Sequence, residues 1–270
     1  MTKLEGRIAK FPPRKSGPIS YREAGRGQAL LCLHGIGSNS GGWLHQLEGL
    51  SERFRVIAWD APGYEDSEML KEEKPGAALY AQALHGLLER LLLKDVVIVA
   101  NSLGGLFAGA YARAHGERVR NMLLISPTGG YGAAEESVRT EKRDGRFKML
   151  DEIGPEGMAE KRSPTLFGKK MTPEALELAR WSMRRIHPAG YRQAVWCLDT
   201  GRHLDDARHY AKPVLVVCGT EDTVTPPAGC ENVAAAYPKG RYRALPDLGH
   251  VSHMEDPALI NREITEFVTA

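Results

Sequence analysis

The sequence predicts an α/β protein with a mostly parallel central sheet flanked by helices. Two observations support this prediction. In the first half of the chain, short apolar runs alternate with longer segments of helical period, which is the pattern of successive β-α-β units. After residue 130, a long charged segment of helical period interrupts this alternation, and two further strand-like runs follow it. We therefore expect a helical insertion in an otherwise continuous α/β core.

The first half of the chain supplies four strands and three helices. We expect strands at 29–33, 54–59, 96–100 and 122–126, and helices at 43–50, 77–93 and 104–115. In the second helix, apolar residues recur three and four positions apart, which is the spacing of an amphipathic helix. The third strand, VVIVA, is apolar throughout and rich in β-branched residues, as expected for a strand that is buried on both faces.

The second half supplies the insertion and the end of the core. Residues 131–210 are charged and helical in period, without a convincing strand. The later elements are strands at 214–218 and 241–245 and a final helix at 257–268. We predict a core domain of residues 1–130 and 211–270, with a helical cap, or lid, of residues 131–210 inserted after the sixth strand. Such a cap would cover the carboxyl ends of the strands, where ligands bind in open α/β sheets.

The composition is that of a soluble globular protein. Of 270 residues, 42% are hydrophobic and 26% are charged, and a net charge of +2 indicates neither a nucleic-acid nor a membrane-surface partner. The N-terminus lacks the apolar stretch of a secretory signal. None of the cysteines forms a CxxC pair, which indicates reduced thiols: Cys32, Cys197, Cys218 and Cys230. We expect a cytoplasmic monomer or small homo-oligomer that acts on a small molecule.

The strongest chemical signal is the segment ANSLGG at 100–105, which lies between a buried strand and a helix. A serine on so tight a turn adopts a strained backbone and needs small residues two positions before and after it. Ala100 and Gly104 meet this requirement around Ser102, although the motif is usually written GxSxG. We predict that Ser102 is a nucleophile; a serine that only caps the helix is the alternative.

A serine hydroxyl near neutral pH needs a base that is itself held in position. Two later segments of the chain supply candidate residues for this. Asp222 follows the strand-like run at 214–218, and His250 follows the last strand-like run. Alone, the aspartate fits a turn cap equally well, and the histidine fits a surface position. The chain order Ser, Asp, His recurs in one class of serine hydrolases. We therefore predict a catalytic triad of Ser102, Asp222 and His250.

Two neighbours of His250 are weaker candidates. Asp247 is too close in sequence to orient the imidazole ring easily, and we expect it to shape the loop. His253 forms an HxxH pair with His250, but no third ligand follows at zinc-like spacing. We therefore expect neither a metal nor a cofactor.

The glycine-rich turn HGIG at 34–37 follows the first clear strand. Such a turn can aim a backbone N–H at the oxygen of a reacting carbonyl group, and the helix start after the serine offers a second N–H. We predict an oxyanion hole formed by the N–H groups of Ile36 and Leu103. A plain strand-to-loop turn is the alternative.

These segments together resemble the α/β-hydrolase fold family. The matching motifs are HGIG at 34–37, DAPG at 60–63, ANSLGG at 100–105, GTEDTVTP at 219–226 and LGH at 248–250. The resemblance implies the α/β-hydrolase fold and identifies the helical segment as the family's cap. Members with an aspartate nucleophile, such as haloalkane dehalogenases and epoxide hydrolases, are disfavoured because Ser102 occupies that position.

Two subfamilies are similar to this sequence. The segment HGIGSNSGGW at 34–43 resembles the same loop of meta-cleavage-product hydrolases, which break a carbon–carbon bond in ring-opened aromatic compounds. That resemblance implies substrate-binding roles for Asn101 and Arg180, which would bind a carboxylate or dienolate oxygen, and for Val251, which stands where those enzymes have tryptophan. The segment HPAGYRQAV at 187–195 instead resembles the lid of enol-lactonases and carboxylesterases.

Three functions follow from the sequence. The first is hydrolysis of a small-molecule carboxylic ester or lactone through an acyl-enzyme on Ser102. The second is carbon–carbon bond hydrolysis of ring-opened aromatic acids of the 2-hydroxy-6-oxodienoate type. The third is a ligand-binding receptor on a hydrolase scaffold.

Overall fold

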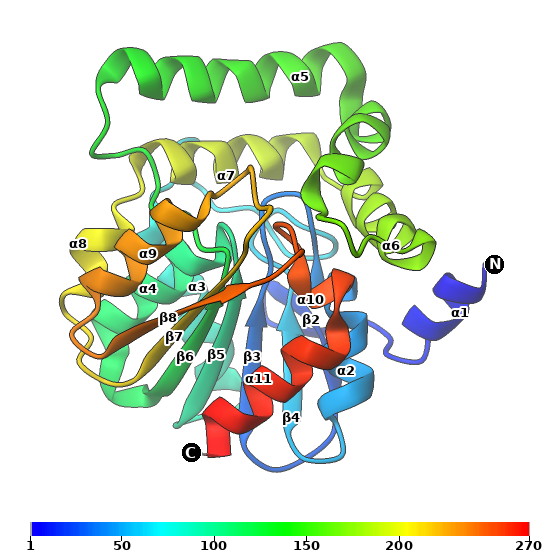
Figure 1. The fold of residues 1–270 in the computed structure, drawn as a ribbon, viewed down its shortest axis with the longest axis vertical. Coiled ribbons are helices and arrows are strands. Elements are labelled where there is room, and N and C mark those ends of the chain that lie inside the picture. The colour runs from blue at the N-terminus through cyan, green and yellow to red at the C-terminus, as the bar shows by residue number, and fades with distance from the viewer. Residues whose placement is uncertain (1, 270) are drawn as a thin grey trace.

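Eight strands form one central sheet in the computed structural model, which describes residues 2–269 (Figure 1). The strands are β1 Arg14–Ser16, β2 Ile19–Ala24, β3 Ala29–Leu33, β4 Arg55–Trp59, β5 Val96–Asn101, β6 Val119–Ile125, β7 Val214–Gly219 and β8 Gly240–Leu245. Their order across the sheet is β1-β2-β4-β3-β5-β6-β7-β8. β2 pairs antiparallel with β1 and β4, whereas all the pairs from β4 to β8 are parallel. The predicted mostly parallel sheet is confirmed.

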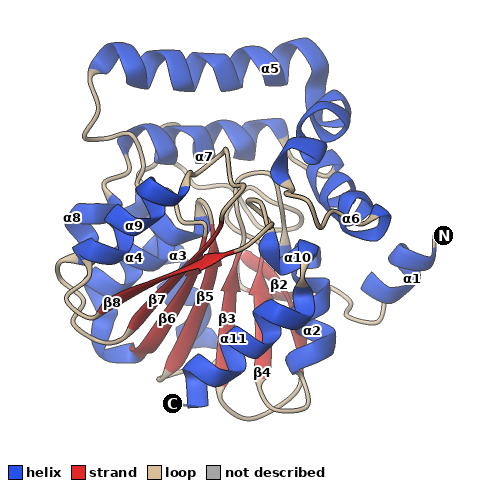
Figure 2. Cartoon of the chain, viewed as in Figure 1, coloured by secondary structure: helices blue, strands red, loops and turns tan. Residues whose placement is uncertain are grey.

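Helices cover both faces of the sheet (Figure 2). The helices of the core are α1 Lys3–Ile8, α2 Leu44–Leu50, α3 Ala77–Arg90, α4 Gly104–His115, α9 Pro227–Ala236, α10 Ser252–Glu255 and α11 Pro257–Thr269. Apolar side chains of α3, α4 and α9 pack with one face of the sheet, and those of α2 and α11 pack with the other. Within residues 2–269, no helix is both long enough and apolar enough to cross a membrane.

The insertion after β6 is helical in the structure, as predicted. Its helices are α5 Glu136–Arg162, α6 Pro173–Arg184, α7 Pro188–Thr200 and α8 His203–Ala207, with a short 3₁₀ helix at Ser163–Leu166. The backbone of α5 breaks at Gly154, whose φ is +60°, directly before Pro155. Proline breaks a helix because it lacks the N–H of the helical ladder. α5 and α7 lie beyond the carboxyl edge of the sheet (Figure 1).

Most helices and strands lie where the sequence predicted them, but the strands β1 and β2 at one edge of the sheet were not predicted. β3 and α4 have the predicted bounds, whereas the prediction did not include β1, β2, α1 or α9. β2 carries Ser20, Arg22 and Glu23 among its six residues, so it lacks the apolar run of the inner strands. It is nevertheless mostly buried, because loops and helix α2 cover this side of the sheet.

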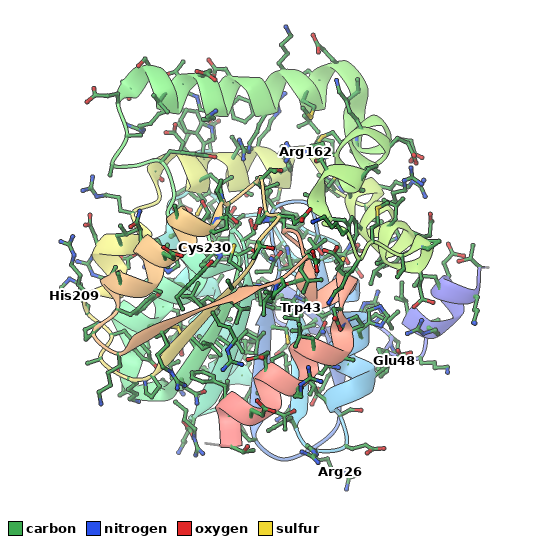
Figure 3. The ribbon with its side chains drawn as sticks, viewed as in Figure 1. Arg26, Trp43, Glu48, Arg162, His209 and Cys230 are labelled. Atoms are coloured by element: carbon green, nitrogen blue, oxygen red, sulfur yellow. The ribbon has the colours of Figure 1, made fainter. Side chains whose placement is uncertain are left out.

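Two buried histidines are neutral in the folded protein. Burial lowers the pKa of His34 to about 4. Burial and then the charge of His250 lower the pKa of His253 to about 3. His253 packs against the buried ring of Trp43, with ring centroids 4.5 Å apart (Trp43 is labelled in Figure 3). In the unfolded chain, a histidine takes up a proton at about pH 6.5.

These shifts predict that stability falls as the pH falls below about 6.5. In that range the unfolded chain binds protons that the folded chain does not, at a cost of about 2 kcal/mol for each histidine by pH 5. We expect the Tm of the wild type to fall between pH 7 and pH 5, and the Tm of His253→Leu to fall less steeply. Thermal unfolding monitored by circular dichroism at each pH measures this slope. His209→Leu, at an exposed position, is the control; equal slopes for all three proteins would contradict the assignment.

Candidate active site

Ser102 lies on a strained turn between β5 and α4. Its φ is +54°, in the left-handed region that side chains other than glycine rarely adopt. The turn is tight because the Ser102 N–H donates to the carbonyl of Ile125 on β6, at 3.0 Å. A Cβ atom at Gly104 would lie 2.3 Å from the carbonyl oxygen of Leu33, so only glycine fits there. The backbone strain and the small residue expected at this turn are thus both present.

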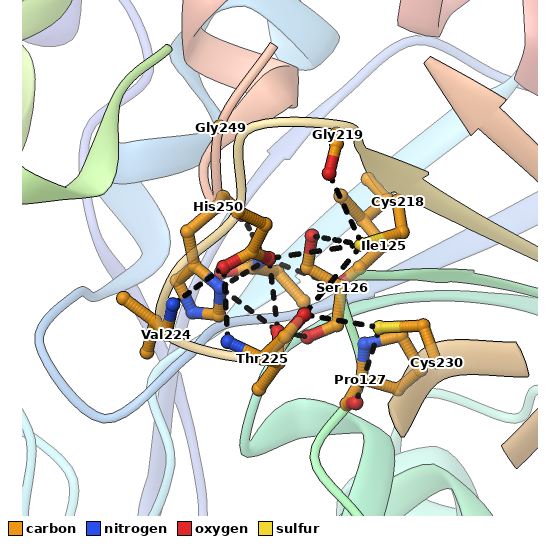
Figure 4. Close-up of polar contacts among 12 residues, drawn as sticks. Ile125, Ser126, Pro127, Cys218, Gly219, Val224, Thr225, Cys230, Gly249 and His250 are labelled. Atoms are coloured by element: carbon orange, nitrogen blue, oxygen red, sulfur yellow. Dashed lines mark hydrogen bonds and ion pairs between the residues drawn. The ribbon is translucent and has the colours of Figure 1, made fainter. Parts of the chain in front are cut away.

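Asp222 and His250 form a buried hydrogen-bonded pair, and Figure 4 shows His250 beside Val224 and Thr225. The Nδ1 atom of His250 lies 2.9 Å from Oδ2 of Asp222, and the two side chains are 6% and 0% exposed. The other carboxylate oxygen accepts the N–H groups of Val224 and Thr225, at 2.8 and 2.9 Å. Burial opposes ionisation of Asp222, but the hydrogen bond and charge of His250, together with the N–H of Thr225, lower its pKa below the ordinary value. The carboxylate therefore holds the ring with Nδ1–H as donor and Nε2 free to accept a proton.

Thr225 completes this group, although the sequence analysis gave it no role. Its Oγ1 lies 2.9 Å from Oδ2 of Asp222 and 3.1 Å from Nδ1 of His250. The same hydroxyl lies 3.0 Å from the carbonyl oxygen of Ser126, which directly follows the neighbouring strand β6. The sequence did offer one sign of this role, because Thr225 lies three residues after Asp222 in the segment GTEDTVTP.

Ser102 and His250 line one cavity between the core and the cap. Its volume is about 750 Å³, including the part that is open to solvent. Most of the lining is apolar and comes from both parts of the chain, for example Ile36, Met158, Met183 and Leu198. Within the described residues, Oγ of Ser102 makes no hydrogen bond, and such contacts often tighten only when substrate binds.

The backbone next to Ser102 offers two unused donors. Neither the N–H of Ile36 nor that of Leu103 has an acceptor among residues 2–269, although Leu103 is fully buried. Buried N–H groups are rarely left without a partner in folded proteins. The loop that carries Ile36 is fixed by His34, whose Nδ1 bonds to the carbonyl of Gly35 at 2.8 Å, and by Tyr64, whose hydroxyl donates to the carbonyl of Ile36 at 2.9 Å.

Of the three residues expected to bind substrate, two line the cavity above Ser102. Val251 lines the cavity and packs with apolar residues of α1 and α6. Asn101 also lines it, but its amide nitrogen donates to the carbonyls of Ile125 and His250, both at 3.1 Å. This leaves Asn101 no free N–H for a substrate carboxylate.

Arg180 does not reach the cavity. Its Nη2 lies 2.9 Å from the carboxylate of Glu160 on α5, and Arg180 is absent from the residues that line the space above Ser102. The structure therefore pairs Arg180 within the cap and does not place it beside a substrate. Two other cap arginines, Arg146 and Arg162, do line the cavity.

The loop that carries His250 is held by the cap. The N–H of His250 donates to the carbonyl of Leu166, at 2.8 Å. The buried carboxylate of Glu255 accepts the N–H of Gly249 at 2.8 Å and, across the boundary, those of Gly168 and Lys170 at 2.9 and 3.1 Å. Cap segment and histidine loop are thus joined through one side chain. This residue was not predicted, because an acidic side chain at the end of a short helix carries no distinctive signal in the sequence.

We predict that Glu255→Gln loosens the histidine loop. An amide has one acceptor oxygen, so at least one of the three N–H groups loses its partner, at a cost of about 1–3 kcal/mol. Chemical unfolding should show a lower free energy of unfolding, and amide hydrogen exchange should rise at Gly168 and Gly249. Glu266→Gln, at an exposed site on α11, is the matched control. Unchanged exchange in Glu255→Gln would show that the contact does not hold the loop.

The weaker candidates have structural positions. Asp247 adopts φ +63° in the loop before His250, and its backbone carbonyl accepts the N–H of Lys169 at 2.9 Å. His253 lies in the core beside Trp43. Within residues 2–269, no three side chains of histidine, cysteine, aspartate or glutamate gather as a metal site would require. The four cysteines are buried thiols.

Comparison with known proteins agrees with this fold. The model of the alpha/beta hydrolase family matches residues 30–263, which is most of the chain. The chain belongs to this family. Among curated relatives, the hydrolase is 27% identical to a 2-hydroxy-6-oxo-6-phenylhexa-2,4-dienoate hydrolase from Comamonas testosteroni, over 99% of each chain.

Two solved structures share the architecture of this alpha/beta hydrolase. A thermophilic esterase from Thermogutta terrifontis superposes with a TM-score of 0.83 at 26% identity, over 94% of this chain and 96% of the esterase. The enol-lactonase from Burkholderia xenovorans LB400 superposes with a TM-score of 0.85 at 23% identity, over 96% of this chain and all of the lactonase. At these identities the structural similarity establishes the fold.

Proposed function

We propose that this hydrolase cleaves a small-molecule carboxylic ester or lactone through an acyl-enzyme on Ser102. The observation that carries the proposal is the His250–Asp222 pair beside the strained serine turn, at the edge of an apolar cavity. Burial of the pair and the 2.9 Å contact support an oriented general base. The apolar lining supports a small organic substrate over a polymer.

In the proposed reaction, Oγ of Ser102 attacks the carbonyl carbon while Nε2 of His250 takes its proton. The oxyanion of the tetrahedral intermediate accepts hydrogen bonds from the N–H groups of Ile36 and Leu103, whose lack of other acceptors supports this role. The intermediate collapses as the alcohol leaves with the proton from His250, so that the acyl group stays on Ser102. Water then attacks this ester with His250 as base, which releases the acid and restores the serine.

Carbon–carbon bond hydrolysis is the second candidate, and the Comamonas relative favours it. That relative is named for a 2-hydroxy-6-oxodienoate substrate and aligns with the whole chain. Two observations weigh against it: Arg180 pairs with Glu160 and does not reach the cavity, and Asn101 lines the cavity but its amide N–H groups are already bonded to backbone carbonyls.

We predict that Ser102→Ala abolishes turnover of p-nitrophenyl acetate and butyrate. Loss of the nucleophile typically lowers kcat by several orders of magnitude, and the alanine fits the buried turn, so the Tm should change little. Release of p-nitrophenol, followed by absorbance, measures the rate. Retention of most of the activity in the alanine variant would refute the nucleophile assignment.

The substrate class is tested by comparing two substrates on the wild type. Turnover of the p-nitrophenyl esters alone supports the ester hydrolase, whereas faster turnover of a 2-hydroxy-6-oxodienoate supports the second candidate. If neither substrate reacts and a fluorophosphonate probe does not label the protein, a ligand-binding receptor becomes the better account.

A further inference from the structure

The wall of the cavity that belongs to the cap carries two arginines. Arg146 lies within the first part of α5 and Arg162 at its end, and both line the same cavity as Ser102. No aspartate or glutamate lines this cavity within the described residues. The ionisable groups that face it besides His250 are these two arginines and two tyrosines, Tyr131 and Tyr191.

Neither guanidinium has a carboxylate partner among residues 2–269. The guanidinium of Arg162 forms no hydrogen bond and no ion pair with any residue that the structure describes. Arg146 donates only to the carbonyl of Lys142 in its own helix, at 3.3 Å, and its Cζ lies 5.8 Å from the ring centroid of Tyr131. Other cap arginines are paired, such as Arg139 with Asp199 at 2.7 Å.

This arrangement is unfavourable in the absence of a ligand. Both arginines are half-buried, and a cation that leaves water without a counter-charge loses hydration that nothing replaces. Burial lowers the pKa of Arg162; Tyr191 opposes this shift, and the charge of Arg146 adds to it. An anion bound in the cavity that both arginines line would neutralise this charge through charge-assisted hydrogen bonds, which arginine forms readily with carboxylates.

We propose that Arg146 and Arg162 form an anion subsite that binds a carboxylate of the substrate. This inference rests on the proposed function and narrows it: the preferred substrate is an ester or lactone that carries a free carboxylate beyond the scissile carbonyl. The apolar lining between core and cap takes the connecting carbon chain. Arg162, the last residue of α5, lies below the long upper part of this helix in Figure 3, on the side that faces the core. The short helix after it leads to Leu166, which accepts the N–H of His250.

Paired esters test the subsite on the whole protein. Monomethyl glutarate and monomethyl adipate carry the charge, and methyl valerate and methyl hexanoate are their neutral partners of equal acyl length. We expect kcat/KM of the wild type to favour the charged ester of a pair at least tenfold, measured by titration of the released acid at constant pH. Arg162→Gln and Arg146→Gln should each reduce that preference about ten- to a hundredfold, mainly through KM, as expected when a charge-assisted hydrogen bond is lost.

Lys148→Gln is the matched control, since it removes one positive charge from an exposed position of the same helix. Its ester preference should equal that of the wild type. The proposal is overturned if the wild type prefers the neutral esters, or if the arginine variants slow both members of a pair equally.

A binding measurement separates this inference from the proposed function. If no ester is turned over, the hydrolytic proposal fails, yet adipate should still raise the Tm of the wild type and not that of Arg162→Met. The methionine variant should itself be at least as stable as the wild type, because it removes an unpaired, half-buried charge. Equal effects of adipate on both proteins would remove the anion subsite whatever the activity.

Discussion

The arrangement of this site depends on one buried hydrogen bond, between Asp222 and His250. Three separate parts of the chain must meet for it to form: the turn after β7, the loop after β8, and the cap segment whose Leu166 carbonyl accepts the N–H of His250. Water competes with such a contact at the surface, but both side chains are buried. The parallel strands bring Ser102 to the same edge of the sheet, so that the strained turn lines the cavity beside the histidine.

The sequence predicted the inner part of this architecture well, because the physical requirements there are strong and local. Strands buried on both faces must be apolar throughout, which located β3 and β5. A serine with positive φ needs a glycine two residues later, where Leu33 leaves no room for a Cβ atom. The edge strand β2 was missed because its polar residues are covered by loops that its own sequence does not describe.

The roles of the cap arginines could not be predicted from the sequence, because they depend on tertiary contacts. Arg180, Arg146 and Arg162 are all basic residues on charged helices, and nothing in their local sequence separates them. Only tertiary packing separates them: the contact of α5 with α6 pairs Arg180 with Glu160, whereas Arg146 and Arg162 line the cavity. The cap therefore holds the histidine loop, and in our proposal it also supplies the positive charge that selects the substrate.

The central claim is that Ser102 is a nucleophile activated by His250. Its most direct test is labelling with a fluorophosphonate, followed by peptide mass spectrometry to locate the adduct. The account predicts one adduct, on Ser102, and little or no labelling of a folded His250→Gln variant. An adduct on another residue, or equal labelling of Ser102 without the histidine, would contradict it.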